Sequence, residues 1–232
     1  MPVLVAAAVC PHPPLLVPEL AAGAAPELDA LRAACDDAVA SLAAARPDRI
    51  VVVGSAPESA DLPHGGTGSF APFGVDVTVR LGAGEAPDLP LSLTVAAWLL
   101  ARTPVAVPVS GLAVAADADA ADCLAAGADL VRGDSRTALL VMGDGSACRT
   151  EKAPGYLDPR AEPYDAAVAR ALAAADPLAL AGLDPDLSEE LWVAGRAAWQ
   201  VMAGAADGAG LGARLTYDEA PYGVGYFVAV WN

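Results

Sequence analysis

Apolar residues in the first part of the chain form short runs separated by a helical pattern. The run Val3–Val9 ends at three prolines that flank His12, and prolines forbid helix continuation, so we predict a buried strand and a rigid loop. Between Pro26 and Ala45 apolar residues recur every three or four positions, and a β-branched run follows at Ile50–Gly54. This order predicts two parallel strands joined by a right-handed helical crossover.

The same alternation continues to the end of the chain. Val75–Leu81 alternates apolar and polar residues, which predicts a strand at an edge or in a mixed part of the sheet. Further strands are predicted at Val105–Val109, Ala138–Met142 and Val224–Trp231, and helices at Leu91–Ala101, Asp117–Val131, Pro163–Ala175 and Ser188–Ala205, the last capped by Ser188. We therefore predict one domain over residues 1–232, a three-layer α/β/α fold with a mostly parallel, mixed central sheet.

Composition narrows the classes of partner. A formal net charge of −16 disfavours nucleic acid and anionic membranes, because both are bound through clustered Lys and Arg. The apolar run at Val3–Val9 has no basic segment before it, and no stretch of about 20 uninterrupted apolar residues occurs. We expect a cytoplasmic protein with reduced cysteines, and a homo-oligomer or a protein partner stays open.

Residues with chemical potential follow three of the predicted strands. In an open parallel sheet, ligands bind beyond the carboxyl ends of the strands. The candidates there are Cys10 and His12 after the first strand, Ser55, Glu58, Asp61 and His64 after the second, and Asp144, Ser146, Cys148 and Arg149 after Ala138–Met142. If these strands are parallel, the chain's two histidines converge with carboxylates, and two histidines with one carboxylate can bind Fe(II).

Four segments resemble the class III extradiol ring-cleavage dioxygenase superfamily, in its LigB-like and Memo-like branches. Ala8–Glu19, with its Cys-Pro-His-Pro-Pro core, is similar to the opening motif, whose histidine is a metal ligand in that family. Val141–Ser146 resembles the family's Gly-Asp-x-Ser-His segment, and Ala153–Arg160 resembles the stretch that follows it. Pro221–Tyr226 is similar to the C-terminal signature of the Memo-like and related branches. The matches keep the family's order over nearly the whole chain, which implies its fold.

The resemblance also implies a site and a chemistry. A metal would be held by His12, His64 and Glu219, with Asp218 as the alternate carboxylate, and Fe(II) or another divalent ion would activate dioxygen. The substrate would be a small aromatic or related acid. The Gly143–Arg160 loop carries the positive charges Arg149, Lys152 and Arg160, which could bind a substrate carboxylate or phosphate. Together with the hydroxyl of Ser146, they are the predicted substrate-binding residues.

Two departures from the family pattern concern catalysis. Ala147 stands where the family has its acid/base histidine, so Asp144, Tyr156 or Cys148 would have to move protons instead. His64 lies several residues beyond the place of the family's second metal histidine. One hypothesis is therefore a divergent, metal-dependent dioxygenase. The alternative is a non-catalytic descendant, without a required metal, that binds a small molecule or a protein partner in the same cleft.

A third hypothesis is a hydrolase or redox enzyme that uses Cys10 or Cys148 as its nucleophile. Structural interpretations compete with each of these roles. His12 can be a loop histidine fixed by prolines, the two cysteines can be packing residues, and Glu219 can be a surface acid.

Overall fold

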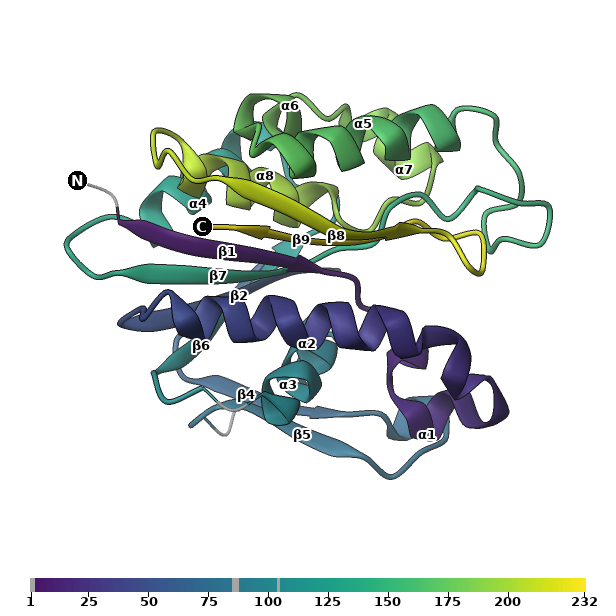
Figure 1. Ribbon diagram of the computed structural model, residues 1–232, viewed down its shortest axis with the longest axis horizontal. Helices are drawn as coiled ribbons and strands as arrows, with labels where there is room; N and C mark the ends of the chain where they lie inside the picture. The colour runs from purple at the N-terminus through teal and green to yellow at the C-terminus, as the bar shows by residue number, and fades with distance from the viewer. Residues whose placement is uncertain (1–2, 85–87, 104) are drawn as a thin grey trace.

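The computed structural model describes residues 3–84, 88–103 and 105–232, and its centre is a seven-stranded sheet (Figure 1). In spatial order the strands are β3 (Ala60–Leu62), β6 (Val109–Ala115), β2 (Arg49–Ala56), β7 (Thr137–Met142), β1 (Leu4–Cys10), β9 (Tyr226–Trp231) and β8 (Ala213–Glu219). The inner strands β6, β2, β7 and β1 are parallel, whereas β3, β9 and β8 are each antiparallel to a neighbour. The predicted mixed, mostly parallel sheet is confirmed.

Helices cover both faces of this sheet and complete the three layers (Figure 1). One face carries α1 (Pro18–Ala21), α2 (Asp29–Ala44) and α3 (Leu91–Arg102), with short 3-10 turns at Pro14–Leu16, Ala22–Leu28 and Ala71–Phe73. The other carries α4 (Ala120–Leu130), α5 (Ala161–Ala174), α6 (Pro177–Ala181), α7 (Pro185–Glu190) and α8 (Arg196–Ala206). No helix in the described ranges combines the length and apolarity that a membrane crossing requires.

The inner strands are apolar on both sides because each side faces a helical layer. Along β1, Ala6, Ala8 and Cys10 pack toward α2, whereas Ala7 and Val9 pack toward α8. The alternation follows from the two-residue period of a strand, which sends successive side chains to opposite faces. The central sheet therefore separates two hydrophobic cores.

Two predicted strands differ in the structure. The strand predicted at Val75–Leu81 was expected in the central sheet, and this was wrong. The observed strand β5 (Thr78–Gly82) pairs with β4 (Gly65–Ser69) in a separate two-stranded sheet. The strand predicted at Val105–Val109 begins only at Val109, where β6 starts to pair with β2. Pro108 precedes that ladder because proline has no N–H to donate to it.

The predicted helix Ser188–Ala205 is two helices, and this prediction was also wrong. α7 ends at Glu190, Trp192 takes a left-handed backbone conformation, and α8 begins at Arg196. Asp184, not Ser188, caps α7 by accepting the backbone N–H groups of the first turn. β8 was missed, because its half-exposed residues do not form an apolar run.

Helices α4 and α8 pack closely because glycines face the opposite backbone. A Cβ atom on Gly127 would clash with the Val201 carbonyl oxygen, and one on Gly204 would clash with the Leu124 carbonyl oxygen. Neither neighbour is a flexible side-chain end. The backbones can therefore approach each other only while both positions lack a side chain.

We expect Gly127→Ala to lower the free energy of unfolding by about 1–3 kcal/mol, because the added methyl group forces two backbones apart. Urea denaturation of both proteins measures the difference. Gly23→Ala is the control, because a Cβ atom at Gly23 meets nothing within 4 Å. Equal stability of the two variants would show that the helices are free to separate.

Candidate functional site

The carboxyl ends of β1, β7 and β2 lie side by side. Cys10 pairs with Met142, and Gly54 pairs with the same residue from the other side. The Gly143 N–H donates to the Cys10 carbonyl oxygen at 3.0 Å, which carries the pairing one residue beyond β7. The chain then turns, so His12 and Asp144 face each other just outside the sheet.

His12 and Asp144 form the polar centre of this edge. The His12 backbone N–H donates to Asp144 Oδ1 at 2.7 Å, and the His12 side chain is 10% exposed. His12 Nδ1 lies 3.6 Å from that oxygen, which is too long for a hydrogen bond, and it has no other partner in the described residues. A buried nitrogen without a protein partner is uncommon, and a water molecule or a ligand bound beside it can accept or donate the missing hydrogen bond.

Electrostatics couple this pair to Tyr226 at the start of β9. Burial raises the pKa of Asp144 above its ordinary value, and the neighbouring His12 opposes that rise. Burial also raises the pKa of the Tyr226 phenol, and the Asp144 carboxylate adds to the effect, followed by Tyr222 and Tyr217. Tyr226 therefore keeps its proton at neutral pH and can act as a hydrogen-bond donor.

An open cavity of about 520 Å³ lies at the same edge of the sheet. Its lining includes Lys152 and Tyr222, together with Thr150, Glu151, Pro221 and Gly223. Tyr222 donates to Glu27 Oε2 at 3.0 Å and is near enough to Tyr226 to influence its pKa. Tyr222 is thus common to the cavity lining and to the surroundings of Tyr226.

The segments Gly143–Ser146 and Pro221–Tyr226, which both resemble family motifs, are joined by backbone hydrogen bonds. The Gly145 N–H donates to the Gly225 carbonyl oxygen at 2.7 Å, and the Gly225 N–H donates to the Ser146 carbonyl oxygen at 2.9 Å. The two resemblances therefore describe one local unit.

Asp165 of α5, which sequence reasoning missed, holds this unit through hydrogen bonds to Ser146. Its carboxylate accepts the Ser146 N–H and hydroxyl, both at 2.8 Å, and lies 3.1 Å from Arg149 Nη1. Asp165 is almost fully buried, and burial raises its pKa while the Ser146 bonds oppose the rise. Its position on the apolar face of a predicted helix was the available signal, since a buried carboxylate requires partners.

The predicted metal set of His12, His64 and Glu219 is not brought together. His64 follows β3, which runs antiparallel to β6 and returns the chain to the start of that strand. Ile50, which pairs with Val109 at the start of β6, is separated by roughly 13 Å of strand from Gly54, which pairs with Met142, whereas ligand atoms lie about 2 Å from a metal. The described residues contain no group of three His, Cys, Asp or Glu side chains that could hold a metal ion.

Glu219 and Asp218 lie at the same edge as His12 but on an outer strand. Glu219 pairs with Tyr226 across β8 and β9, is exposed, and accepts a hydrogen bond from the Tyr217 hydroxyl at 3.3 Å. Asp218 is exposed too, although partial desolvation of its carboxyl group by neighbouring atoms raises its pKa. The iron ligand set implied by the family resemblance therefore does not fit the residues present.

Most predicted substrate-binding residues have structural partners instead. Ser146 and Arg149 bind Asp165, and Arg160 forms ion pairs with Asp158 and Glu190. Lys152 is the predicted residue that lines the open cavity at this edge.

Tyr156 was predicted to move protons, and Ala147 stands in the place of the family's acid/base histidine. Tyr156 is 63% exposed and has a left-handed backbone conformation, so nothing buries it at the His12 site. Ala147 is buried, and its methyl group cannot transfer protons.

The cysteines of the third hypothesis are buried. Cys148 Sγ lies 3.5 Å from the Leu191 carbonyl oxygen, and burial raises the pKa of its thiol. Cys10 is fully buried in the core on the α2 side of the sheet. Both thiols lack the exposure of a reactive nucleophile, so the structure favours a packing role.

Comparisons with known proteins support the fold alone. No family model matches the chain, and no curated protein matches it significantly. The crystal structure of the uncharacterized protein JW3007 from Escherichia coli K12 is similar, with a TM-score of 0.56 at 15% sequence identity. The match covers 98% of this chain and 99% of that chain, so the whole architecture is shared.

We expect Asp144→Asn to raise the free energy of unfolding at pH 7. The raised pKa means that the folded protein binds this proton more tightly than the unfolded chain, so ionisation destabilises the wild type as pH rises through that pKa. Asparagine keeps the acceptor for the His12 N–H and carries no charge.

Urea denaturation between pH 3 and pH 8 tests this expectation. The advantage of Asp144→Asn should vanish as pH falls below the ordinary range of about 3.9 for Asp. Asp76→Asn, at an exposed position, is the control and should show no such trend. A less stable Asp144→Asn variant at pH 7 would contradict a raised pKa.

Removing the Ser146 hydroxyl should destabilise the loop unit. We expect Ser146→Ala to lower the free energy of unfolding by about 1–3 kcal/mol, because a buried Asp165 oxygen loses a hydrogen bond. Thermal or urea denaturation measures the loss, with exposed Ser135→Ala as the control. No difference between the variants would make Ser146 a substrate-binding candidate again.

Proposed function

We propose that this protein is a ligand-binding member of the extradiol-dioxygenase-like fold that does not cleave aromatic rings. Its ligand is a small hydroxylated aromatic acid or a related acid, bound at the strand-end site of His12 and Asp144. The observation that carries the proposal is the buried Nδ1 of His12, which has no partner in the described residues and lies 3.6 Å from the largely buried carboxylate of Asp144. A ligand hydroxyl can satisfy both groups, since it accepts one hydrogen bond and donates another.

The surroundings of the pair suit such a ligand. Tyr226 offers a protonated phenol next to Asp144, and Tyr222 connects this position to the cavity that Lys152 lines. In a protein with a net charge of −16, an acidic ligand needs a local cation, and Lys152 supplies one. The ring hydroxyl would bind at His12 and Asp144, and the carboxylate would point toward Lys152.

The positions of the two histidines favour binding over ring cleavage. Ring cleavage by this family relies on a two-histidine iron site and an additional acid/base histidine, and the chain has two histidines in total. His64 lies at the opposite edge of the sheet from His12. This separation favours a binding role for His12 over an iron-dependent reaction.

Binding of 3,4-dihydroxybenzoate, measured by calorimetry and by amide chemical shifts, tests the proposal. We expect saturable binding that His12→Asn weakens about tenfold, because the hydrogen bond between His12 Nδ1 and the ligand hydroxyl is lost. His64→Asn is the matched control and should bind like the wild type. Lys152→Gln should weaken the binding of 3,4-dihydroxybenzoate. It should leave the binding of catechol unchanged, because catechol lacks the carboxylate.

Metal analysis and oxygen uptake decide between binding and catalysis. Protein purified without a histidine tag and loaded with Fe(II) under anaerobic conditions should retain less than about a tenth of an equivalent, because open-site iron needs a complete ligand set. It should consume no oxygen over a panel of catechols. Stoichiometric iron with catechol-dependent oxygen uptake would overturn the proposal.

A further inference from the structure

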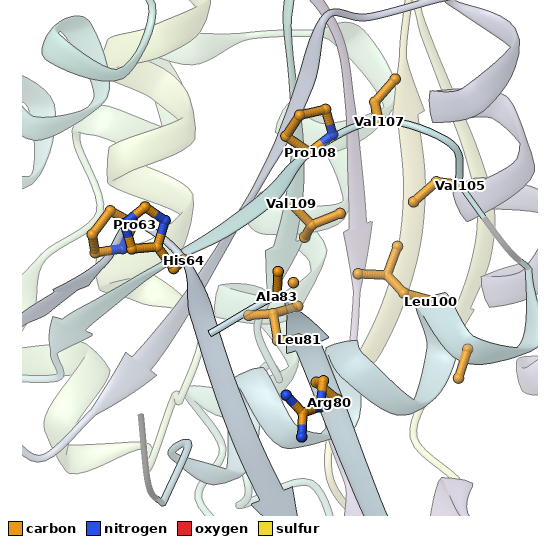
Figure 2. A pocket seen from close by; sticks show the side chains of 12 residues that line it. Pro63, His64, Arg80, Leu81, Ala83, Leu100, Val105, Val107, Pro108 and Val109 are labelled. Carbon is orange, nitrogen blue, oxygen red and sulfur yellow. The ribbon is translucent and has the colours of Figure 1, made fainter. Parts of the chain in front are cut away.

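A second cavity lies at the other edge of the sheet, far from His12. It has a volume of about 500 Å³ and is formed where the end of β5, the end of α3 and the segment before β6 meet. Figure 2 shows Leu100, Val105 and Val107 on one side of it, with Pro63 and His64 on the other. This size suits one small organic molecule, since ligand pockets commonly measure about 300–1,000 Å³.

The walls of this cavity are largely apolar. Leu81 and Leu100 are buried, and Val105, Val107 and Val109 are half-buried, so their side chains offer hydrocarbon surface to an occupant. Removing that surface from water stabilises a bound apolar group by roughly 25 cal/mol for each Å². An aliphatic or aromatic body therefore fits between these residues.

The charged lining residue is basic. Arg80 lines the cavity, His64 adds an imidazole, and the described lining contains neither Asp nor Glu. Arg80 donates to the Gly84 carbonyl oxygen at 3.3 Å, which uses one of the five N–H donors of a guanidinium group. A carboxylate can accept from the others.

We propose that this cavity binds a small amphipathic carboxylic acid. Its apolar body lies among Leu81, Leu100 and Val105, and its carboxylate faces Arg80. Charge selects the class: a cationic amphiphile would meet like charge at Arg80, and a neutral one would leave the guanidinium without an ionic partner. The inference does not rest on the proposed function, because it concerns another site at the opposite edge of the sheet.

Titration with octanoate, followed by amide chemical shifts, tests this inference on the intact 23.1 kDa chain. We expect saturable shifts at Gly82, Val105 and Val107, with none at His12 or Asp144. Octylammonium should produce no saturable shifts, and methyl octanoate should bind at least about tenfold more weakly than octanoate. Shifts confined to His12 and Asp144 would place the acid at the other edge and overturn the inference.

Two substitutions separate the charge from the cavity. Arg80→Gln should weaken the binding of octanoate at least about tenfold, because the ionic contact is lost. The binding of methyl octanoate, which makes no ionic contact, should stay unchanged. Arg170→Gln, an exposed change of equal charge on α5, is the control and should match the wild type. Ala83→Trp, at an exposed lining position, should fill the cavity and remove binding of both.

Either of two results would overturn the inference. One is a titration in which the shifts do not saturate at octanoate concentrations up to about 1 mM, because the affinity would then be too weak for a specific site. The other is equal weakening by Arg80→Gln and Arg170→Gln, which would show a general effect of net charge.

Discussion

The parallel ladder between β1 and β7 is the constraint on which the rest of the structure depends. Its register sets Cys10 beside Met142, and the added bond from the Gly143 N–H holds the two chain segments together beyond the last paired residues. A shift of one residue would send every apolar side chain of β1 to the wrong face, so burial in two cores fixes this register strongly. His12 and Asp144 meet because they follow the ladder at matching positions.

Burial of carboxylates at this edge opposes stability. Asp144 and Asp165 both have pKa values raised by burial, so their ionised forms are less favourable in the folded protein than in water. Asp165 recovers part of that cost through Ser146 and Arg149, and its role in joining two loops is structural. Asp144 accepts the His12 N–H and faces an imidazole that it does not bind. That difference is the reason for proposing Asp144, and not Asp165, as the carboxylate that binds a ligand.

The two edges of the sheet offer different chemistry. The carboxyl edge combines a histidine, a carboxylate and tyrosines, which suits a ligand with hydroxyl groups. The amino edge combines hydrocarbon walls with Arg80, which suits an amphipathic acid. His64 belongs to the second edge because β3 reverses the chain after β2.

Local sequence patterns determined the layered fold and the place of His12. Apolar runs and helical spacing act over a few residues, so β1, β2, β7 and the long helices could be predicted, and the order of strands and helices indicated the parallel sheet. The position of Asp144 directly after β7 followed from the same pattern. Only the tertiary structure placed His64 away from the site, moved β5 into its own hairpin and revealed Asp165 as a support for Ser146. These outcomes depend on strand direction and on contacts between residues far apart in the chain, which a local pattern does not encode.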